Sequence, residues 1–478
     1  MANDYYTHSG YPAYEVPGDT ASARAEFDAI QTGFNSLNNV PRRLVTLAGT
    51  NTLTATAVPA LLAYVTDQLF TAEAAGANTG AVTISISSLA ALNLLRPDGT
   101  ALQAGDIPGA NYPLVIQTRA TDAVLLNPYN GMDPVLSGRN RVINGDMQIA
   151  QVNGTAAVTP AASVYVLDQW DYVTTQASKL TFQQVADAPA GFKYSLKVSV
   201  AAQFSPGAAD NFVIAQPIEG HNLIDIQFGL AGANKIAVSL WVKGSVAGTY
   251  ACSLRNGALN RSYVGTIAAT TGWGLQTVIL TADTTGTWAT DNTAGLWFSV
   301  DLGSGTNFNA TAGAWGATNS TRTSGAITFV NQAVGSTLHM TGIQIEPVPT
   351  TATAGTSFEY LPYETQLRRC QRYLPVLNSD STGSIIGSAY SNSTVSAVGI
   401  VQLPTATRIA PTGIVSTAAS QFTFKSAGAF VGSAIAFYAA STTVGEFFLT
   451  IAAATAGQGG HIFFNNASAQ LYFTGAQM

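Results

Sequence analysis

Hydrophobic and polar residues alternate with a period of two along much of the chain. The stretches 82–86 and 296–302 each place Val, Ile, Leu or Phe at every second position. A strand with one buried face and one solvent face has this pattern. Residues 236–242 are closer to continuously apolar, as in a central strand that is covered on both faces. Turn signals rich in Gly, Pro and Asp separate these runs, so the pattern predicts many short strands.

A helical pattern lies near the N-terminus, after an arm at 1–19 that is rich in Tyr, Pro and Gly. Apolar residues recur there at spacings of four, three, four and three, at Ala23, Phe27, Ile30, Phe34 and Leu37. This spacing places them in one stripe on one face of a helix. The stripe either covers the neighbouring domain of its own chain or forms a seam between identical chains, and two heptads are too few to decide.

These patterns predict an all-β, multi-domain chain. The largest block holds all six tryptophans and favours a two-sheet sandwich of jelly-roll type. The expected order is an arm and short helix at 1–40, a small antiparallel β domain at 41–130, the jelly-roll sandwich at 138–362, a helical connector at 363–374 and a small C-terminal β-sandwich at 375–478.

Composition narrows the classes of function. Charged residues make up 10% of the chain, the net charge is -6, and Lys and Arg are scattered. A protein that binds a phosphate backbone needs a basic face, so nucleic acid is not an expected partner. The most apolar stretch, 426–440, is interrupted by Ser and Gly and falls short of the roughly 18 residues of a spanning helix, so membrane insertion is not expected. Cys252 and Cys370 form no CxxC pair and are expected to be buried small hydrophobes.

No reactive cluster stands out in the sequence. The four histidines lie in separate segments, and HExxH, GxSxG and a phosphate-binding glycine loop are missing. We therefore expect no catalytic residues and no cofactor. Paired carboxylates for glycoside hydrolysis are the alternative to weigh, since the large block contains Asp168, Asp171, Glu219, Asp225, Asp283, Asp291, Asp301 and Glu346.

Two kinds of binding site can also be sought. Oxygen ligands from separated loops often hold calcium in sandwiches, and Asp146, Asp168 or Glu346 could do so, but no contiguous calcium loop supports a metal site. Exposed tryptophan faces stack on sugar rings. Trp273, Trp288 and Trp315 lie near turns and are the candidates for stacking, with burial in the core as the competing interpretation.

Several motifs together resemble those of bacteriophage tail fibre proteins. The segment 22–30 (SARAEFDAI) is similar to an N-terminal segment of phage tail proteins, and 98–107 is similar to a β domain common in fibres. The strongest resemblance is to a jelly-roll domain recurrent in phage tail and fibre proteins, which is itself similar in outline to carbohydrate-binding modules. It rests on 139–147 (RNRVINGDM), 168–170 (DQW), 239–243 (SLWVK), 260–263 (NRSY), 343–346 (IQIE), 358–360 (FEY) and 369–373 (RCQRY).

The resemblance implies a homotrimer located in the virion. Its N-terminus would attach to tail, adaptor or collar proteins, and its later β modules would face host surface glycan or lipopolysaccharide. We therefore expect a structural protein that serves host attachment. Two other functions stay open: a purely architectural tail, collar or baseplate protein, and a polysaccharide depolymerase.

Overall fold

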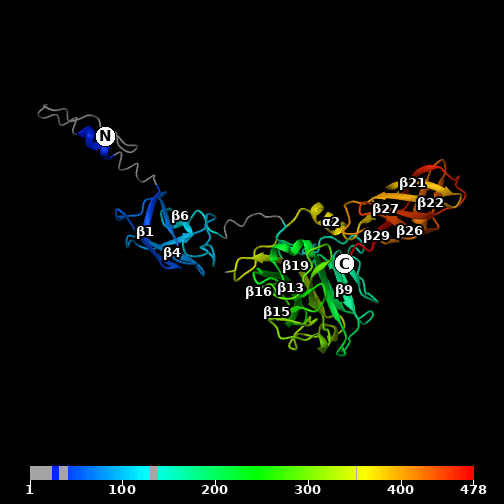
Figure 1. Ribbon diagram of the computed structural model, residues 1–478, viewed down its shortest axis with the longest axis horizontal. Coiled ribbons are helices and arrows are strands. Elements are labelled where there is room, and N and C mark those ends of the chain that lie inside the picture. The colour runs from blue at the N-terminus through cyan, green and yellow to red at the C-terminus, as the bar shows by residue number, and fades with distance from the viewer. Residues whose placement is uncertain (1–23, 32–40, 130–137, 351) are drawn as a thin grey trace. The chain divides into compact units, whose positions relative to one another are not determined.

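The structure, a computed structural model, describes four stretches of the chain: 24–31, 41–129, 138–350 and 352–478 (Figure 1). Contacts divide the chain into two compact units, one up to residue 136 with 351–353, the other comprising 137–350 and 354–478. Nearly all regular structure is β-strand, which confirms the predicted all-β, multi-domain class. Among the described stretches, no helix is both long and apolar enough to cross a bilayer.

The predicted N-terminal stripe is described only in part. Residues 24–31 are helical, with Phe27 69% exposed and Ile30 half-buried. Phe34 and Leu37 lie outside the described residues. The choice between a seam and a cover for the neighbouring domain therefore stays a prediction.

The first unit contains a closed barrel of seven strands. Its strands follow one another around the barrel in the order β1-β2-β4-β5-β7-β6-β3. Their bounds are β1 Arg42–Ala48, β2 Thr52–Ala57, β3 Leu69–Glu73, β4 Val82–Ile86, β5 Leu92–Leu95, β6 Pro113–Thr118 and β7 Ala123–Leu125. The alternation in the sequence sets the inward face, because Val82, Ile84 and Ile86 are buried while the Thr and Ser between them are half-buried.

The barrel is mixed, which corrects the expectation of an antiparallel domain. Three of its pairs are parallel: β1 with β3, β2 with β4, and β5 with β7. The period of two is the same for both directions of pairing, so the pattern could not reveal this. Strand direction depends on which strands the connections bring together when the barrel closes.

The second unit begins with a sandwich of two sheets. One sheet has the order β10-β11-β19-β13-β16 and the other β18-β15-β14-β17-β12-β9-β8. The five-stranded sheet consists of β10 Leu180–Val185, β11 Ser195–Val200, β13 Lys235–Gly244, β16 Gly274–Thr281 and β19 Thr337–Val348. The seven-stranded sheet consists of β8 Val164–Leu167, β9 Trp170–Thr174, β12 Phe212–Glu219, β14 Gly248–Asn256, β15 Ser262–Ala269, β17 Ala294–Asp301 and β18 Trp315–Gly316.

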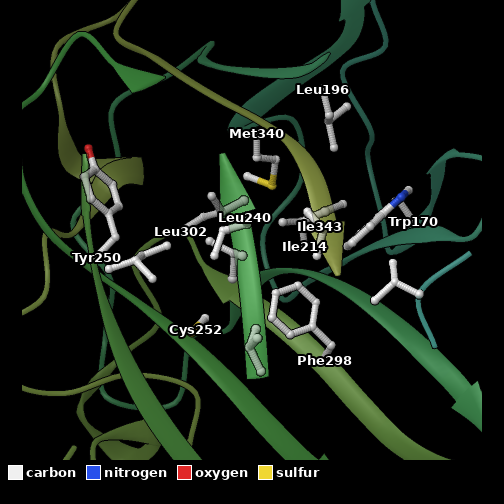
Figure 2. Close-up of a cluster of buried hydrophobic side chains, with 14 of the residues drawn as sticks. Trp170, Leu196, Ile214, Leu240, Tyr250, Cys252, Phe298, Leu302, Met340 and Ile343 are labelled. Atoms are coloured by element: carbon white, nitrogen blue, oxygen red, sulfur yellow. The ribbon is translucent and has the colours of Figure 1, made fainter. Parts of the chain in front are cut away.

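Large apolar side chains from both sheets meet in the core of the sandwich (Figure 2). Trp170 and Phe298 are fully buried and meet edge to face, with ring centroids 6.2 Å apart. The indole Nε1 of Trp170 donates to the Asn144 carbonyl at 3.0 Å, so its polar atom is satisfied. Cys252 lies in the same core, and both cysteines are free and buried, as expected.

The segment 139–147 forms a compact loop that packs against β19 and helix α2 (Tyr363–Gln371). A Cβ atom at Gly145 would lie 2.1 Å from the Ile343 carbonyl oxygen, so only glycine fits there. The Asn144 side chain donates to the Ile149 and Asp168 carbonyls and accepts from the Ile149 backbone. Residues of this loop and of the end of helix α2 contribute to a small apolar cluster of Ile143, Ile149, Cys370 and Tyr373. Two motifs more than 200 residues apart in the chain therefore build one junction.

The chain ends in two further sheets, with the orders β20-β29-β23 and β25-β24-β28-β21-β22-β27-β26. A cluster of buried phenylalanines, including Phe424 and Phe447, fills this module. Its strands are β20 Val376–Asn378, β21 Ile385–Ser393, β22 Ser396–Gln402, β23 Gly413–Ser416, β24 Phe422–Lys425, β25 Ala429–Val431, β26 Ala434–Ala440, β27 Val444–Thr450, β28 Gly459–Phe464 and β29 Gln470–Thr474. Arg408 links the module to the sandwich, since its guanidinium donates to the carbonyls of Asn292, Ala476 and Gln477.

Candidate functional site

Two of the three predicted sugar-stacking tryptophans are part of an aromatic cluster. Trp288 stacks on Phe228 at 4.2 Å between ring centroids, and Trp315 meets Trp288 edge to face at 5.5 Å. Both pack against the sandwich core. Their indole nitrogens donate to the carbonyls of Thr285 and Thr281. A ring that already stacks on a neighbour offers at most one free face, so the geometry favours packing for this pair.

Trp273 is not part of that cluster and directly precedes β16. The Lys243 ammonium lies 5.2 Å from the centre of its ring, and its Nε1 donates to Asp187 at 3.2 Å. Asp187 also forms an ion pair with Lys243. The edge of the His339 ring approaches Trp273, and burial lowers the pKa of His339 to about 4. Trp273 is half-buried and remains a candidate for stacking.

Most of the eight candidate carboxylates have structural partners. Ion pairs join Glu219 to Arg372, Asp225 to Arg141, Asp283 to Arg261, Asp301 to Arg322 and Glu346 to Arg139. Asp291 accepts hydrogen bonds from Thr293 within its own turn. Burial raises the pKa of Asp171 to about 6, and it also raises those of Asp168 and Asp301. Raised pKa values alone do not make the facing pair of carboxyls that glycoside hydrolysis needs.

The calcium candidates are also engaged by protein groups. Asp168 accepts hydrogen bonds from the backbone and side chain of Gln151, and Asp146 accepts from Gln148 at 2.7 Å. Burial raises the pKa of both carboxyls. Among the described residues, no three His, Cys, Asp or Glu side chains are grouped so that they could hold a metal ion.

A groove of about 590 Å³ lies beside these carboxylates, where residues 148–154, helix α2 and the start of the last module meet. We call it the amide groove. Its walls carry amide, tyrosine and charged side chains, namely Gln148, Gln151, Gln184, Lys193, Tyr194, Tyr363, Gln371, Asn378 and Asp380, together with Ala150, Gly154, Leu367 and Val376. Tyr363 is 56% exposed at its rim.

The hydrogen bonds of the groove orient its amides. The side-chain nitrogens of Gln148, Gln151 and Gln184 donate to Asp146, to Asp168 and to the Met147 carbonyl, respectively. Within the described part of the chain, their side-chain oxygens accept no hydrogen bond. These oxygens are acceptors that are fixed in place by the protein. Sugar hydroxyls are donors, and a preoriented acceptor costs little conformational entropy on binding.

The amide groove was not predicted from the sequence. Its residues come from three separate parts of the chain, 148–154, 184–194 and 363–380, so no local pattern marks them. One signal was available, because Gln148 and Gln151 directly follow the motif at 139–147 and Gln371 lies inside the motif at 369–373. These two motifs could have pointed to the groove only if their proximity in the fold had been known.

Comparisons with known proteins give structural neighbours alone. No protein-family model matches the chain, and no curated protein matches its sequence. The structural neighbours are carbohydrate-binding modules. A family 11 module from a cellulosomal cellulase of Clostridium thermocellum is 10% identical, with a TM-score of 0.22 over 40% of this chain and 96% of its own. TmCBM61, solved with β-1,4-galactotriose, is 11% identical, with a TM-score of 0.23 over 44% of this chain and 99% of its own.

A third neighbour is the CBM22-1 xylan-binding domain from Paenibacillus barcinonensis Xyn10C. It is 9% identical, with a TM-score of 0.21 over 42% of this chain and 99% of its own. TM-scores and identities this low carry no conclusion about what the chain binds.

Proposed function

We propose that this chain is a non-enzymatic tail fibre protein of a bacteriophage that binds a host surface glycan through the amide groove. The observation that carries the proposal is the groove itself, which is lined by Tyr194, Tyr363 and glutamine side chains. The amide nitrogens of Gln148 and Gln151 donate to the buried carboxylates of Asp146 and Asp168, which leaves their amide oxygens as oriented acceptors. Fixed acceptors beside aromatic rings suit the hydroxyls and apolar faces of a neutral sugar. The assignment to phage fibres rests on the resemblance of the motifs at 139–147 and 369–373, which flank the groove.

The contacts of the candidate carboxylates support the proposal that the protein has no catalytic activity. Five of the eight candidates for glycoside hydrolysis form ion pairs with arginine. A carboxylate that contacts an arginine guanidinium already takes part in a structural interaction, which makes it a poor candidate for the acid or base of glycoside hydrolysis. Release of new reducing ends from a bacterial polysaccharide by the purified protein would contradict this part of the proposal.

A homotrimer completes the proposed function. Single β modules bind glycans weakly, and three copies on one axis raise the avidity without any new contact. The stripe that includes Phe27 and Ile30 would dock the assembly to the virion or join its chains. A mass measurement of the assembled protein tests this step, and a monomeric mass would contradict it.

The main experiment compares binding to a panel of purified bacterial surface polysaccharides and lipopolysaccharides. Tyr363→Ala and Gln184→Ala alter the groove, and Tyr390→Ala removes a tyrosine that is 42% exposed on β21. We expect the two groove variants to lose binding by roughly tenfold, the effect of one hydrogen bond or ring contact, and Tyr390→Ala to bind as the parent does. Equal binding by all four proteins would contradict a groove site. Virions that carry the groove variants and adsorb normally would favour a purely architectural role.

A further inference from the structure

Helix α2 separates two hollows. Tyr363, Leu367 and Gln371 face the amide groove, and Thr365 and Arg369 line a second hollow of about 260 Å³. The two sets are offset by two residues, which is roughly 200° around a helix. We call the second hollow the arginine pocket. It is lined by Gly138, Asn140, Arg141, Asn222, Leu361, Thr365 and Arg369.

Two guanidinium groups line this small space. Arg141 forms an ion pair with Asp225 and donates to the Gly138 carbonyl at 2.7 Å, while its Nε has no hydrogen-bond partner among the described residues. Among the described residues, Arg369 donates one long hydrogen bond, from Nη2 to the Asn140 carbonyl at 3.4 Å. Arg369 therefore brings a positive charge and several donors that the protein itself does not use well.

Among the described residues, no carboxylate forms an ion pair with Arg369. Asp225 is paired with Arg141. Glu359 is buried and accepts hydrogen bonds from the backbone nitrogens of Gly138 and Asn140. Burial lowers the pKa of Arg369, and the like charge of Arg141 acts in the same direction although Glu359 opposes it. An anion in the pocket would relieve this cost.

The rim of the pocket is polar and accessible. Asn222 and Thr365 are exposed, and no hydrogen bond from either side chain to another described residue is present. An amide and a hydroxyl at the mouth suit the hydroxyl groups of a sugar. The volume is below the usual range of about 300–1,000 Å³ for sites that hold drug-sized ligands, so it fits one sugar residue or its acidic group.

We infer that the arginine pocket binds the anionic group, carboxylate or phosphate, of an acidic sugar residue. Arg369 would supply the main charge-assisted hydrogen bonds, with Arg141 beside it. Asn222 and Thr365 would contact the ring hydroxyls. The inference rests on the proposed function only for the origin of the sugar at the host surface, because the pocket and its charges are independent of that function.

The test measures dissociation constants by NMR titration with four small probes. These are D-glucuronate, D-glucose 6-phosphate, D-glucose and inorganic phosphate. We expect at least one of the two acidic sugars to bind more tightly than both glucose and inorganic phosphate. Binding should weaken with added salt, since the contact is between charges. Inorganic phosphate that binds as tightly as either sugar would overturn the assignment to a saccharide.

Arg369→Gln and Arg368→Gln form a matched pair of variants on the same helix. They make the same change in charge, but Arg368 is exposed and does not line the pocket. Arg369→Gln should weaken binding of the acidic sugar by roughly tenfold or more, the effect of a lost charge-assisted hydrogen bond, and Arg368→Gln by less than about twofold. Undiminished binding by Arg369→Gln, or an equal loss in both variants, would overturn the inference.

Two further outcomes keep the result clear. If Arg369→Gln does not fold, Asn222→Ala and Thr365→Ala replace it, and binding that both leave unchanged would overturn the site. Binding of the acidic sugar by the whole chain, together with no binding of any bacterial surface polysaccharide, would contradict the proposed function and leave the arginine pocket supported.

Discussion

Arg372 donates two hydrogen bonds to Glu219, from Nε and Nη2 to the two carboxylate oxygens, at 3.1 Å each. Glu219 ends strand β12, and its side chain is only 3% exposed, whereas the Arg372 side chain is 37% exposed. This pair fixes the end of helix α2 to the seven-stranded sheet. Because the helix forms one wall of the amide groove and one wall of the arginine pocket, the pair positions both.

Removing the arginine should destabilise the second unit. Arg372→Met leaves the Glu219 carboxylate buried without its partner, which should lower the free energy of unfolding by about 2 kcal/mol. Urea denaturation measures the change. Arg368→Met is the control, because Arg368 is exposed on the same helix. A loss of the same size in both variants would show that the ion pair does not hold the helix.

Asp171 should make stability depend on pH between about 4 and 6. Burial raises its pKa in the folded protein to about 6 from 3.8. The folded state therefore holds the proton more tightly than the unfolded state, so this carboxyl favours folding at low pH and the advantage is lost as the pH rises through 6. Asp171→Asn should thus be more stable than the parent at pH 7, by about 2 kcal/mol, and equal to it near pH 4. Parallel thermal melts at the two pH values provide the test.

The alternation of apolar and polar residues predicted which side chains are buried, but not which strands pair or in which direction. In β4 the residues Val82, Ile84 and Ile86 are buried as their alternation requires, because the side chains of a strand alternate between faces whatever its neighbours are. The parallel pairing of β2 with β4 followed from no local signal. It depends on how the barrel closes, which is a property of the whole chain.

The candidate site was predicted less well than the fold, for a related reason. Tryptophans were chosen as stacking residues because they lie near turns, yet Trp288 and Trp315 pack on each other and on Phe228. Nearness to a turn does not say whether a second turn covers the ring. Gln151 and Tyr363 line the same groove only because the loop at 139–147 packs against helix α2 through residues such as Ile143 and Cys370.

The two kinds of tryptophan can be separated by their effect on stability. Trp288→Ala removes a ring that stacks on Phe228 and packs on the core, so we expect a loss of about 2–3 kcal/mol. Trp273→Ala removes mainly a contact with Lys243 and a hydrogen bond to Asp187, so we expect a loss of about 1 kcal/mol. Urea denaturation of both variants gives the comparison. A larger loss for Trp273→Ala would reverse the assignment of packing and surface roles.

Replacing the buried carboxylate of the barrel should lower the unfolding temperature of the barrel without affecting the second unit. Asp106 is fully buried, accepts two hydrogen bonds from Arg96 at 2.8 Å and a third from the Gln103 backbone. Asp106→Asn breaks this pair and leaves the partly buried guanidinium of Arg96 without its anion, which should cost about 2–3 kcal/mol. For a domain of this size the barrel transition in calorimetry should fall by roughly 10 °C or more.

Calorimetry of the full chain also contains the controls for that prediction. Asp98→Asn makes the same change of charge eight positions earlier, at a carboxylate that bonds only within its own turn to Thr100, so it should leave the barrel transition nearly in place. The transition of the second unit should not move in either variant, since the barrel has its own closed core. Equal shifts of both transitions in Asp106→Asn would mean that the two units unfold together, because a local loss can spread only through a shared cooperative transition.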